Sequence, residues 1–264
     1  MTLPLFSPGD DPGPSFVHLL DKLGLSLPAV DGEPAVAITH GTTIVALRYA
    51  DGVVMAGDRR ATAGSSIAHR AMDKVHPADR YSGVAIAGAA GFALEMVKLF
   101  QLQLEHYEKV EGAHLSLEGK ANQLGMMVRQ NLPSAMQGLA VIPLFAGYDL
   151  RRRQGRIFTY DVTGGRYEES DFHADGSGGR DARTTVKLHW REGLDHNTAI
   201  ELAVQGLYEA ADEDSATGGP DAVRGIYPTV ATITAEGFER VPEEQVAERF
   251  AALIQRKTEQ GLSR

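Results

Sequence analysis

The pattern of a folded domain begins at HGTTIVALRY (residues 40–49). An Asp51-Gly52 turn signal follows, and then VVMAGDRRAT (residues 53–62), so the two apolar runs are predicted to pair as a β-hairpin. The bond between Gly41 and Thr42 stands at the head of the first run. If it is cut, Thr42 carries a free amine beside its hydroxyl, and such an amine can activate a threonine nucleophile.

Composition excludes several classes of protein. The 264 residues suffice for one large domain with an ample core. A formal net charge of −9, with no Lys/Arg cluster interleaved with aromatics, argues against a nucleic-acid partner. The absence of cysteine excludes a Cys nucleophile, thiolate zinc sites and disulfides, and fits a reducing compartment. No apolar run approaches the ~18 residues of a membrane helix, and no basic segment of a secretory signal precedes Lys22. We expect a cytoplasmic protein that binds no membrane.

The first 41 residues form a leader of different character. Prolines at positions 4, 8, 12, 14, 28 and 34 prevent a continuous helix or strand. Ser15 could cap a short helix that carries Phe16, Leu19, Leu20 and Leu23 on one side. Composition leaves two interpretations open: a flexible tail with an apolar patch, or a removable pro-segment that docks before it is lost.

The remaining residues alternate between groups of strands and groups of helices. Two strand groups that bracket helix pairs predict an α+β fold, in which sheets pack face to face with helices outside. Pro133 is expected to end the second helix, and the loop within residues 150–176 is left undefined. The expected strands are 42–49, 53–58, 84–87, 139–148, 156–160 and 225–234, and the expected helices are 90–109, 116–132, 179–190, 197–211 and 242–256.

Common catalytic motifs are missing from the sequence. There is no G-x-S-x-G elbow, no G-x-x-x-x-G-K-[ST] loop and no G-x-G-x-x-G. The nine histidines include no H-E-x-x-H motif, so a histidine zinc site is not expected. We therefore expect neither a cofactor nor a metal.

Thr42, Asp58 and Lys74 remain as candidates for the chemistry. A threonine hydroxyl is hardly ionised at neutral pH and needs a base, which a free α-amine with a pKa near ~8 can provide. A nearby lysine would hold that amine neutral, and an aspartate would fix the lysine. Asp58 ends the strand paired to the one that Thr42 begins, so a regular hairpin brings the two together. Spacing alone leaves open that Asp58 forms a surface pair with Arg59 and that Lys74 is exposed.

Five separated segments, taken together, resemble one family. The order and approximate spacing of GTTIVA (41–46), AGDRRAT (56–62), DK (73–74), AGAA (87–90) and DSATGG (214–219) are similar to those of proteasome β-subunits. The PD pair at 220–221 and the Pro-rich leader resemble the actinobacterial branch. The resemblance covers about residues 40–260. It implies an N-terminal nucleophile hydrolase fold, a four-layer α/β/β/α sandwich of two antiparallel sheets flanked by helices.

The resemblance also implies roles for individual residues. Thr42 would be the nucleophile and its amine the base, with Asp58 and Lys74 as supporting charges. Gly88 would donate a backbone N–H to the oxyanion, although it could also be a plain turn glycine. Ser177 matches a serine near the nucleophile amine, Asp214 matches its partner, and Thr217 stands where the family often has serine.

Substrate contacts follow from the same resemblance. Thr62 would pair with the substrate backbone by β-addition. An apolar pocket would favour an uncharged hydrophobic residue before the cut, although Ile86 and Leu94 could equally be core. The residues that would line this pocket are Ala61, Met72, Ile86, Ala90 and Leu94.

The implied function is that of a threonine-type endopeptidase that degrades unfolded proteins inside a barrel. Residues 1–41 would be a propeptide removed by autocatalytic cleavage, and residues 42–264 the catalytic domain. Expected partners are α-type subunits, other copies of the chain in seven-membered rings, a regulatory ATPase, and protein or peptide substrates. Two alternatives stay open: a simpler bacterial threonine peptidase, and another N-terminal nucleophile amidohydrolase acting on small amides. The retained Thr42, Asp58 and Lys74 argue against a third, a non-catalytic ring subunit.

Overall fold

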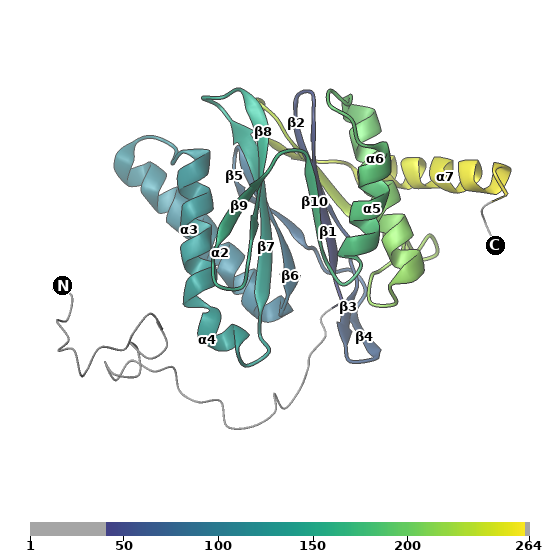
Figure 1. Cartoon of the computed structure of the whole chain (residues 1–264), viewed down its shortest axis with the longest axis horizontal. Coiled ribbons are helices and arrows are strands. Elements are labelled where there is room, and N and C mark those ends of the chain that lie inside the picture. Colours follow the sequence, from purple (N-terminus) through teal and green to yellow (C-terminus); the bar gives the residue numbers. More distant parts are fainter. Residues whose placement is uncertain (1–40, 262–264) are drawn as a thin grey trace, which may run out of the picture. The chain divides into compact units, whose positions relative to one another are not determined.

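Two five-stranded antiparallel sheets form the centre of the fold (Figure 1). A computed structural model of the chain describes residues 41–261, so the expectations for residues 1–40, including the leader helix, lie outside the described residues. The first sheet has the strand order β10-β1-β2-β11-β12 and the second β5-β6-β7-β8-β9. The first consists of β1 (Thr43–Tyr49), β2 (Gly52–Gly57), β10 (Phe172–Gly176), β11 (Thr229–Ile233) and β12 (Phe238–Arg240); the second of β5 (Val75–Asp79), β6 (Ser82–Gly88), β7 (Val141–Asp149), β8 (Gln154–Tyr160) and β9 (Arg166–Glu169).

Helices cover the outer face of each sheet (Figure 1). The second sheet is covered by α2 (Ala90–Glu111) and α3 (Leu117–Gln130), and the first by α5 (Gly179–His189) and α6 (His196–Glu213). The remaining elements are the ribbon of β3 (Ala61–Ala63) with β4 (Ser66–His69), the short α4 (Leu132–Ala135), and α7 (Glu243–Glu259) against α6. The predicted four-layer α/β/β/α sandwich is thus confirmed. Within residues 41–261, no helix is long and apolar enough to cross a membrane.

Three apolar layers separate the four layers of the sandwich, and β1 contributes to two of them. Val45 and Leu47 pack toward α5 and α6, whereas Ile44 and Ala46 pack between the two sheets. Side chains alternate between the faces of a strand, so a strand buried on both faces needs an uninterrupted apolar run. The run at residues 44–47 therefore places β1 in the centre of its sheet, where it pairs with β2 and β10.

Helix boundaries follow local capping signals. Ser116 accepts a hydrogen bond from the Gly119 N–H at 3.1 Å at the start of α3, and Asp195 accepts one from the Thr198 N–H at 3.0 Å at the start of α6. Gly112 ends α2 in the left-handed conformation with φ of 66°. These caps fix the outer helices relative to the strands that carry the site.

Two expected boundaries were wrong. Pro133 lies in the first turn of α4, where proline is tolerated, and α3 already ends at Gln130. The last long strand begins at Thr229 and not at residue 225, because the preceding segment forms a turn closed by the bridge between Asp221 and Ile226. The stretch 150–176 contains all of β8, which includes the expected strand 156–160, together with β9 and β10, which were not expected.

Candidate active site

The peptide bond between Gly41 and Thr42 lies directly before β1. The Thr42 side chain is almost fully buried, and its hydroxyl donates a hydrogen bond to the Gly41 carbonyl oxygen at 2.8 Å. The N–H of Gly41 itself donates a hydrogen bond to Thr62 Oγ1 at 3.0 Å. The hydroxyl of Thr42 is therefore held against the bond that would have to be cut.

Gly41 leaves no room for a side chain. A Cβ added at this position would lie 2.2 Å from the Cβ and 2.5 Å from the carbonyl oxygen of Ala216. Real Cβ atoms do not approach other heavy atoms so closely, because protein interiors are close-packed. The carbonyl of residue 41 thus reaches its position only with glycine there.

Asp58 follows β2 and is fully buried. The hairpin register places it opposite Thr43: the Asp58 N–H donates to the Thr43 carbonyl at 3.0 Å, and the Thr43 N–H donates to Asp58 Oδ1 at 2.7 Å. Asp58 Oδ2 accepts from the N–H groups of Arg60 at 2.9 Å and Gly218 at 2.8 Å. A surface pair of Asp58 with Arg59 does not form, since Arg59 contacts Asp73 and Glu243 instead.

Lys74 precedes β5 and its side chain is 1% exposed, so it is not the surface lysine that spacing left open. Its ammonium donates to Asp58 Oδ1 at 2.6 Å, to the Arg60 carbonyl at 2.6 Å and to the Gly41 carbonyl at 3.3 Å. Burial lowers the pKa of Lys74 below its ordinary value, and the negative charge of Asp58 offsets part of that effect. The cation thus lies between a buried carboxylate and the carbonyl of the Gly41–Thr42 bond.

Ser177 reaches Thr42 because β10 pairs with β1. Thr43 is opposite Gly176 in the register, and the next N–H, that of Ser177, donates to the Thr42 carbonyl at 2.8 Å. The Thr42 N–H donates to Ser177 Oγ at 3.3 Å, and Ser177 Oγ donates to Asp214 Oδ2 at 2.5 Å. The nitrogen that cleavage would free is therefore already linked through a serine hydroxyl to a carboxylate.

Asp214 directly follows α6 as its C-cap residue and accepts hydrogen bonds from several donors. The Thr217 hydroxyl donates to its Oδ2 at 2.6 Å and the Ala216 N–H to its Oδ1 at 3.1 Å. Burial by itself raises the pKa of Asp214, but the hydrogen bonds from Ser177 and Thr217 and from backbone N–H groups outweigh it, so the pKa lies below its ordinary value. Asp214 is accordingly ionised at neutral pH.

Thr43 belongs to the same cluster and was missed at the sequence level. Its fully buried hydroxyl lies 2.6 Å from Thr217 Oγ1 and accepts a hydrogen bond from the Gly178 N–H at 3.1 Å. The only signal in the sequence is a second threonine directly after Thr42. Nothing in the strand pattern distinguishes that threonine from an ordinary β-branched strand residue.

Gly88 and the expected substrate residues lie in defined elements of the fold, and among them Thr62 contacts the Gly41 N–H. Gly88 ends β6 with φ of 107°, and a Cβ there would lie 2.1 Å from the Ala140 carbonyl oxygen, so the backbone requires glycine. Its role as an oxyanion donor stays a prediction. Ala61 and Thr62 are buried on β3, and Ala90 opens α2.

The other three expected pocket residues belong to the apolar layer under α2 and α3. Ile86 is buried in that layer, and Met72 and Leu94 pack against it. All three therefore contribute to core packing. A contact of any of them with substrate stays a prediction.

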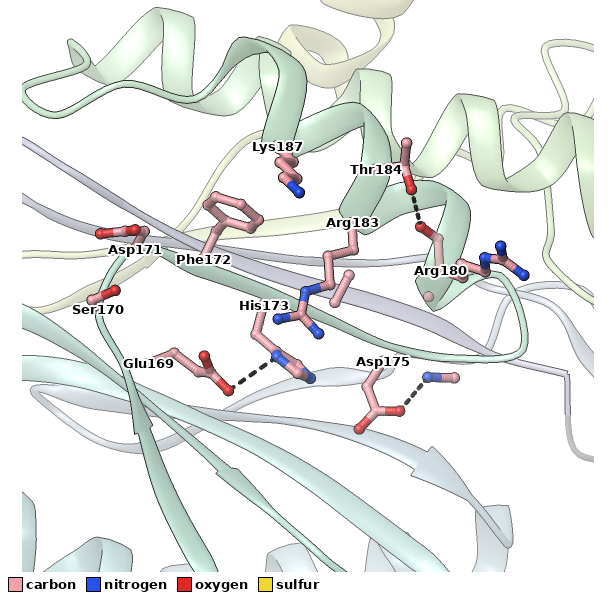
Figure 2. Close-up of a pocket in the computed structure, with 13 residues that line it drawn as sticks. Glu169, Ser170, Asp171, Phe172, His173, Asp175, Arg180, Arg183, Thr184 and Lys187 are labelled. Atoms are coloured by element: carbon pink, nitrogen blue, oxygen red, sulfur yellow. Dashed lines mark hydrogen bonds and ion pairs between the residues drawn. The ribbon is translucent and has the colours of Figure 1, made fainter.

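A separate pocket with a volume of about 680 Å³ runs along β10 and α5 (Figure 2). It is lined by charged residues of both signs, and none of Thr42, Asp58 or Lys74 is among them. Figure 2 shows His173 and Arg183 close together at its centre, with His173 Nδ1 3.3 Å from Glu169 Oε1. Burial lowers the pKa of His173 below its ordinary value. The lining of the pocket also includes Gly176 and Gly179, which flank Ser177 and Gly178 in the sequence.

Comparisons with known proteins agree with one another. Residues 38–224 match the family model described as proteasome subunit. A protein of Acidimicrobium ferrooxidans named proteasome subunit beta is 61% identical over 266 residues, which cover 100% of this chain and 97% of that relative. Proteins of the same name from Streptomyces griseus and Acidothermus cellulolyticus are 60% and 58% identical, over 89% and 84% of this chain and 83% and 77% of their own lengths.

Proposed function

Since this chain belongs to the proteasome subunit family and its relatives are β subunits, we propose that Thr42 is its nucleophile, freed by cleavage of the Gly41–Thr42 bond. The chain is a proteasome β subunit, the catalytic subunit of the core particle, and a threonine-type endopeptidase. The observation that supports the assignment to Thr42 is the position of its hydroxyl, 2.8 Å from the Gly41 carbonyl oxygen that Lys74 also contacts.

Self-cleavage begins with attack of Thr42 Oγ1 on the Gly41 carbonyl carbon. Negative charge then develops on the Gly41 oxygen, and the ammonium of Lys74 lies 3.3 Å away to stabilise it. The C–N bond breaks, the proton lost by the hydroxyl passes to the Thr42 nitrogen, and Gly41 becomes esterified to Thr42. Water hydrolyses this ester, which leaves a carboxylate on Gly41 and both a free hydroxyl and a free amine on Thr42.

The freed amine then serves as the base for peptide hydrolysis. An α-amine has a pKa near ~8, so a neutral fraction is present at physiological pH. The positive charge of Lys74 favours both the neutral amine and an ionised hydroxyl. Ser177, which accepts from the Thr42 nitrogen at 3.3 Å, holds the amine in place. Attack on a substrate carbonyl breaks the peptide bond: the carboxyl-terminal fragment leaves as an amine that takes the proton from the Thr42 amine, and the amino-terminal fragment stays as an ester on Thr42. Water then hydrolyses this ester and releases the amino-terminal fragment with a new carboxylate.

The domain division follows from this chemistry. Residues 1–41 are the propeptide and residues 42–264 the catalytic domain. Gly88 donates its N–H to the substrate oxyanion, and Thr62 holds the substrate backbone as its side chain holds the Gly41 N–H at 3.0 Å. An apolar pocket that includes Ala61 and Ala90 favours uncharged hydrophobic residues before the cut.

As a β subunit, the chain assembles with α subunits in a core particle. In the finer arrangement of our proposal, seven copies form a ring, α rings close the ends, and a regulatory ATPase supplies unfolded proteins in the cytoplasm. Helix α2 supports an assembled state, because Leu99, Leu102 and Val110 are 49%, 61% and 65% exposed and recur at helical spacing. Exposed apolar stripes of this kind mark surfaces that a partner covers.

The mass of the assembled chain tests the proposal. In co-expression with an α-type partner, the wild type should lose its first 41 residues, Thr42→Ala should keep them and be inactive, and Thr42→Ser should be cut with reduced activity. Correct cleavage of Thr42→Ala without another protease would refute self-cleavage. A fully active monomer would favour a small-amide hydrolase over the barrel, and an assembled wild-type particle that is uncut and inactive would favour a non-catalytic ring subunit.

A further inference from the structure

The hydroxyl of Thr43 completes a chain of hydrogen bonds with one possible direction. Asp214 is ionised and can only accept, so the Thr217 hydroxyl must donate its proton to Asp214 Oδ2, at 2.6 Å. Thr217 Oγ1 then accepts from the Thr43 hydroxyl, 2.6 Å away. The Thr43 oxygen in turn accepts from the Gly178 N–H at 3.1 Å. Every proton in the chain points toward Asp214.

The same carboxylate oxygen holds the serine that contacts the nucleophile residue. Asp214 Oδ2 accepts from Thr217 and from Ser177 Oγ, and Ser177 Oγ accepts from the Thr42 nitrogen. Thr43 and Thr217 are fully buried, so water cannot replace either hydroxyl. The space is closed further at Gly178, where an added Cβ would lie 2.6 Å from Thr43 Oγ1 and 2.7 Å from Thr217 Oγ1.

The backbone of Thr43 is fixed without help from its side chain. Its N–H donates to Asp58 Oδ1 and its carbonyl accepts from the Asp58 N–H, while β1 pairs with β2 and β10 on either side. The strand therefore does not need the Thr43 hydroxyl to stay in place. What that hydroxyl adds is a donor to Thr217, and polarisation along a hydrogen-bond chain strengthens the bond at its end.

From these contacts, we propose that Thr43 is a positioning residue of the peptidase, acting through Thr217 on the Asp214 oxygen that orients Ser177 against the Thr42 amine. This inference rests on the proposed function, because the amine exists only after Thr42 is freed. Without the Thr43 donor, the negative charge of Asp214 is less neutralised by Thr217. The Asp214 carboxylate then stabilises the protonated form of the Thr42 amine, so that less of the neutral amine is available as a base at a given pH.

The test compares Thr43→Val, which keeps the shape and removes the hydroxyl, with Thr43→Ser, which keeps the hydroxyl. Both are measured as assembled particles, co-expressed with the α-type partner, by the pH profile of peptide hydrolysis. We expect kcat of Thr43→Val to fall roughly ten- to a hundredfold, the range of small misplacements in active sites, with KM little changed. The acidic limb of its profile should move to higher pH, whereas Thr43→Ser should keep the wild-type profile.

A matched control separates positioning from loss of a buried hydroxyl in general. Thr159 on β8 is also buried and donates to Glu169 at 3.2 Å, in the other sheet, so Thr159→Val should leave kcat and the pH profile unchanged. If Thr43→Val does not assemble, Thr217→Val breaks the same chain one link nearer to Asp214 and must shift the acidic limb in the same direction.

Two results would overturn the proposal: an unshifted acidic limb in the hydroxyl-deleted variant, or equal defects in Thr43→Val and Thr43→Ser. Thr42→Ala particles are measured alongside. Activity that survives in Thr42→Ala would refute the proposed function itself, so the two failures are distinguishable.

Discussion

Within residues 41–261, two lysines are buried against aspartates, one at each end of β5. Lys74 pairs with Asp58 before the strand, with side chains 1% and 0% exposed. Lys120, on α3, pairs with Asp79 at the end of the strand, with side chains 4% and 13% exposed. Asp79 also accepts from the Tyr81 N–H at 3.0 Å and from Ser82 Oγ at 2.6 Å. The second pair therefore fastens a helix to the turn between β5 and β6.

The difference between the pairs lies in what else the ammonium touches. Lys74 also contacts the Gly41 carbonyl, whereas the described partner of Lys120 is the carboxylate of Asp79. Burial and pairing alone thus do not define a catalytic lysine, because structural ion pairs show both. The contact of Lys74 with the carbonyl of the Gly41–Thr42 bond distinguishes the first pair from the second. Each of the following predictions tests this difference.

The largest effect is expected from Lys74→Ala in assembled particles. Without the ammonium, neither the Thr42 hydroxyl nor the Gly41 oxygen has a cation nearby, so peptide hydrolysis should be abolished while the sandwich still forms. Lys74→Arg should also be poor, since a planar guanidinium does not replace a compact ammonium. Turnover of a peptide substrate is the measurement. Near-normal turnover by either variant would make Lys74 as structural as Lys120.

A smaller but still large effect is expected from displacing the carbonyl that Lys74 contacts. In Gly41→Ala the new Cβ would meet Ala216 at 2.2 Å, so the Gly41 carbonyl must shift and processing should slow by an order of magnitude or more (roughly 10- to 100-fold). Gly91→Ala on α2 is the matched control, because nothing lies within 4 Å of a Cβ there. The rate of conversion from full-length to cut chain is followed by mass. Equal rates for the two variants would exclude a role for the exact carbonyl position.

The pH dependence of activity and stability also distinguishes Lys74 from Lys120. Burial lowers the pKa of Lys74 below its ordinary value of 10.5, so its charge and the activity should be lost at a pH below 10.5. The unfolded chain keeps this proton to higher pH than the folded chain does. The contribution of Lys74 to stability therefore rises as pH increases from the folded pKa to the unfolded one.

Two measurements check this prediction: the alkaline limb of peptide hydrolysis, and the unfolding free energy of the wild type relative to Lys74→Ala as the pH is raised toward 10.5. Activity should fall while the wild type gains stability relative to the variant. A Lys120→Arg particle should show the wild-type alkaline limb. An alkaline limb at or above pH 10.5 would argue against a buried, catalytically required lysine.

The smallest effect on activity is expected from Lys120→Met. The variant leaves Asp79 without its cation, and breaking a buried pair costs roughly 3–5 kcal/mol, toward the lower end here because Asp79 is partly exposed. Peptide turnover per assembled particle should stay within about twofold of the wild type, since surface and structural changes far from a site rarely alter its chemistry. A thermal unfolding scan alongside the kinetic assay measures both. A large loss of turnover would show that the two pairs are coupled.

The parts of the fold set by local pattern were predictable from the sequence. The Asp51-Gly52 turn and the apolar run after Thr42 gave the β1–β2 hairpin, and its register brings Asp58 to Thr43. The sequence pattern did not predict β10, because apolar and polar residues do not alternate regularly over Phe172–Gly176. Pairing with β1, more than burial of its own side chains, holds this strand in the sheet. Ser177 was therefore identified only through a family resemblance.

The chemistry of the site was harder to derive, because it depends on contacts between distant segments. Lys74 is separated from Asp58 by the β3–β4 ribbon, and no periodicity shows that the two side chains meet. Lys120 stands in a helix where a lysine is normally exposed, and its burial depends on the turn that Asp79 closes. Thr43 was missed for the same reason, since its partners Gly178 and Thr217 are contributed by two other segments.

The mass of the β chain in Lys74→Ala and Lys120→Met particles, prepared side by side with the α-type partner, tests the contrast most directly. If the contact with the Gly41 carbonyl is what makes Lys74 catalytic, the Lys74→Ala chain keeps residues 1–41 and the Lys120→Met chain begins at Thr42. A Lys74→Ala chain that is cut at Thr42 as completely as Lys120→Met would contradict this account.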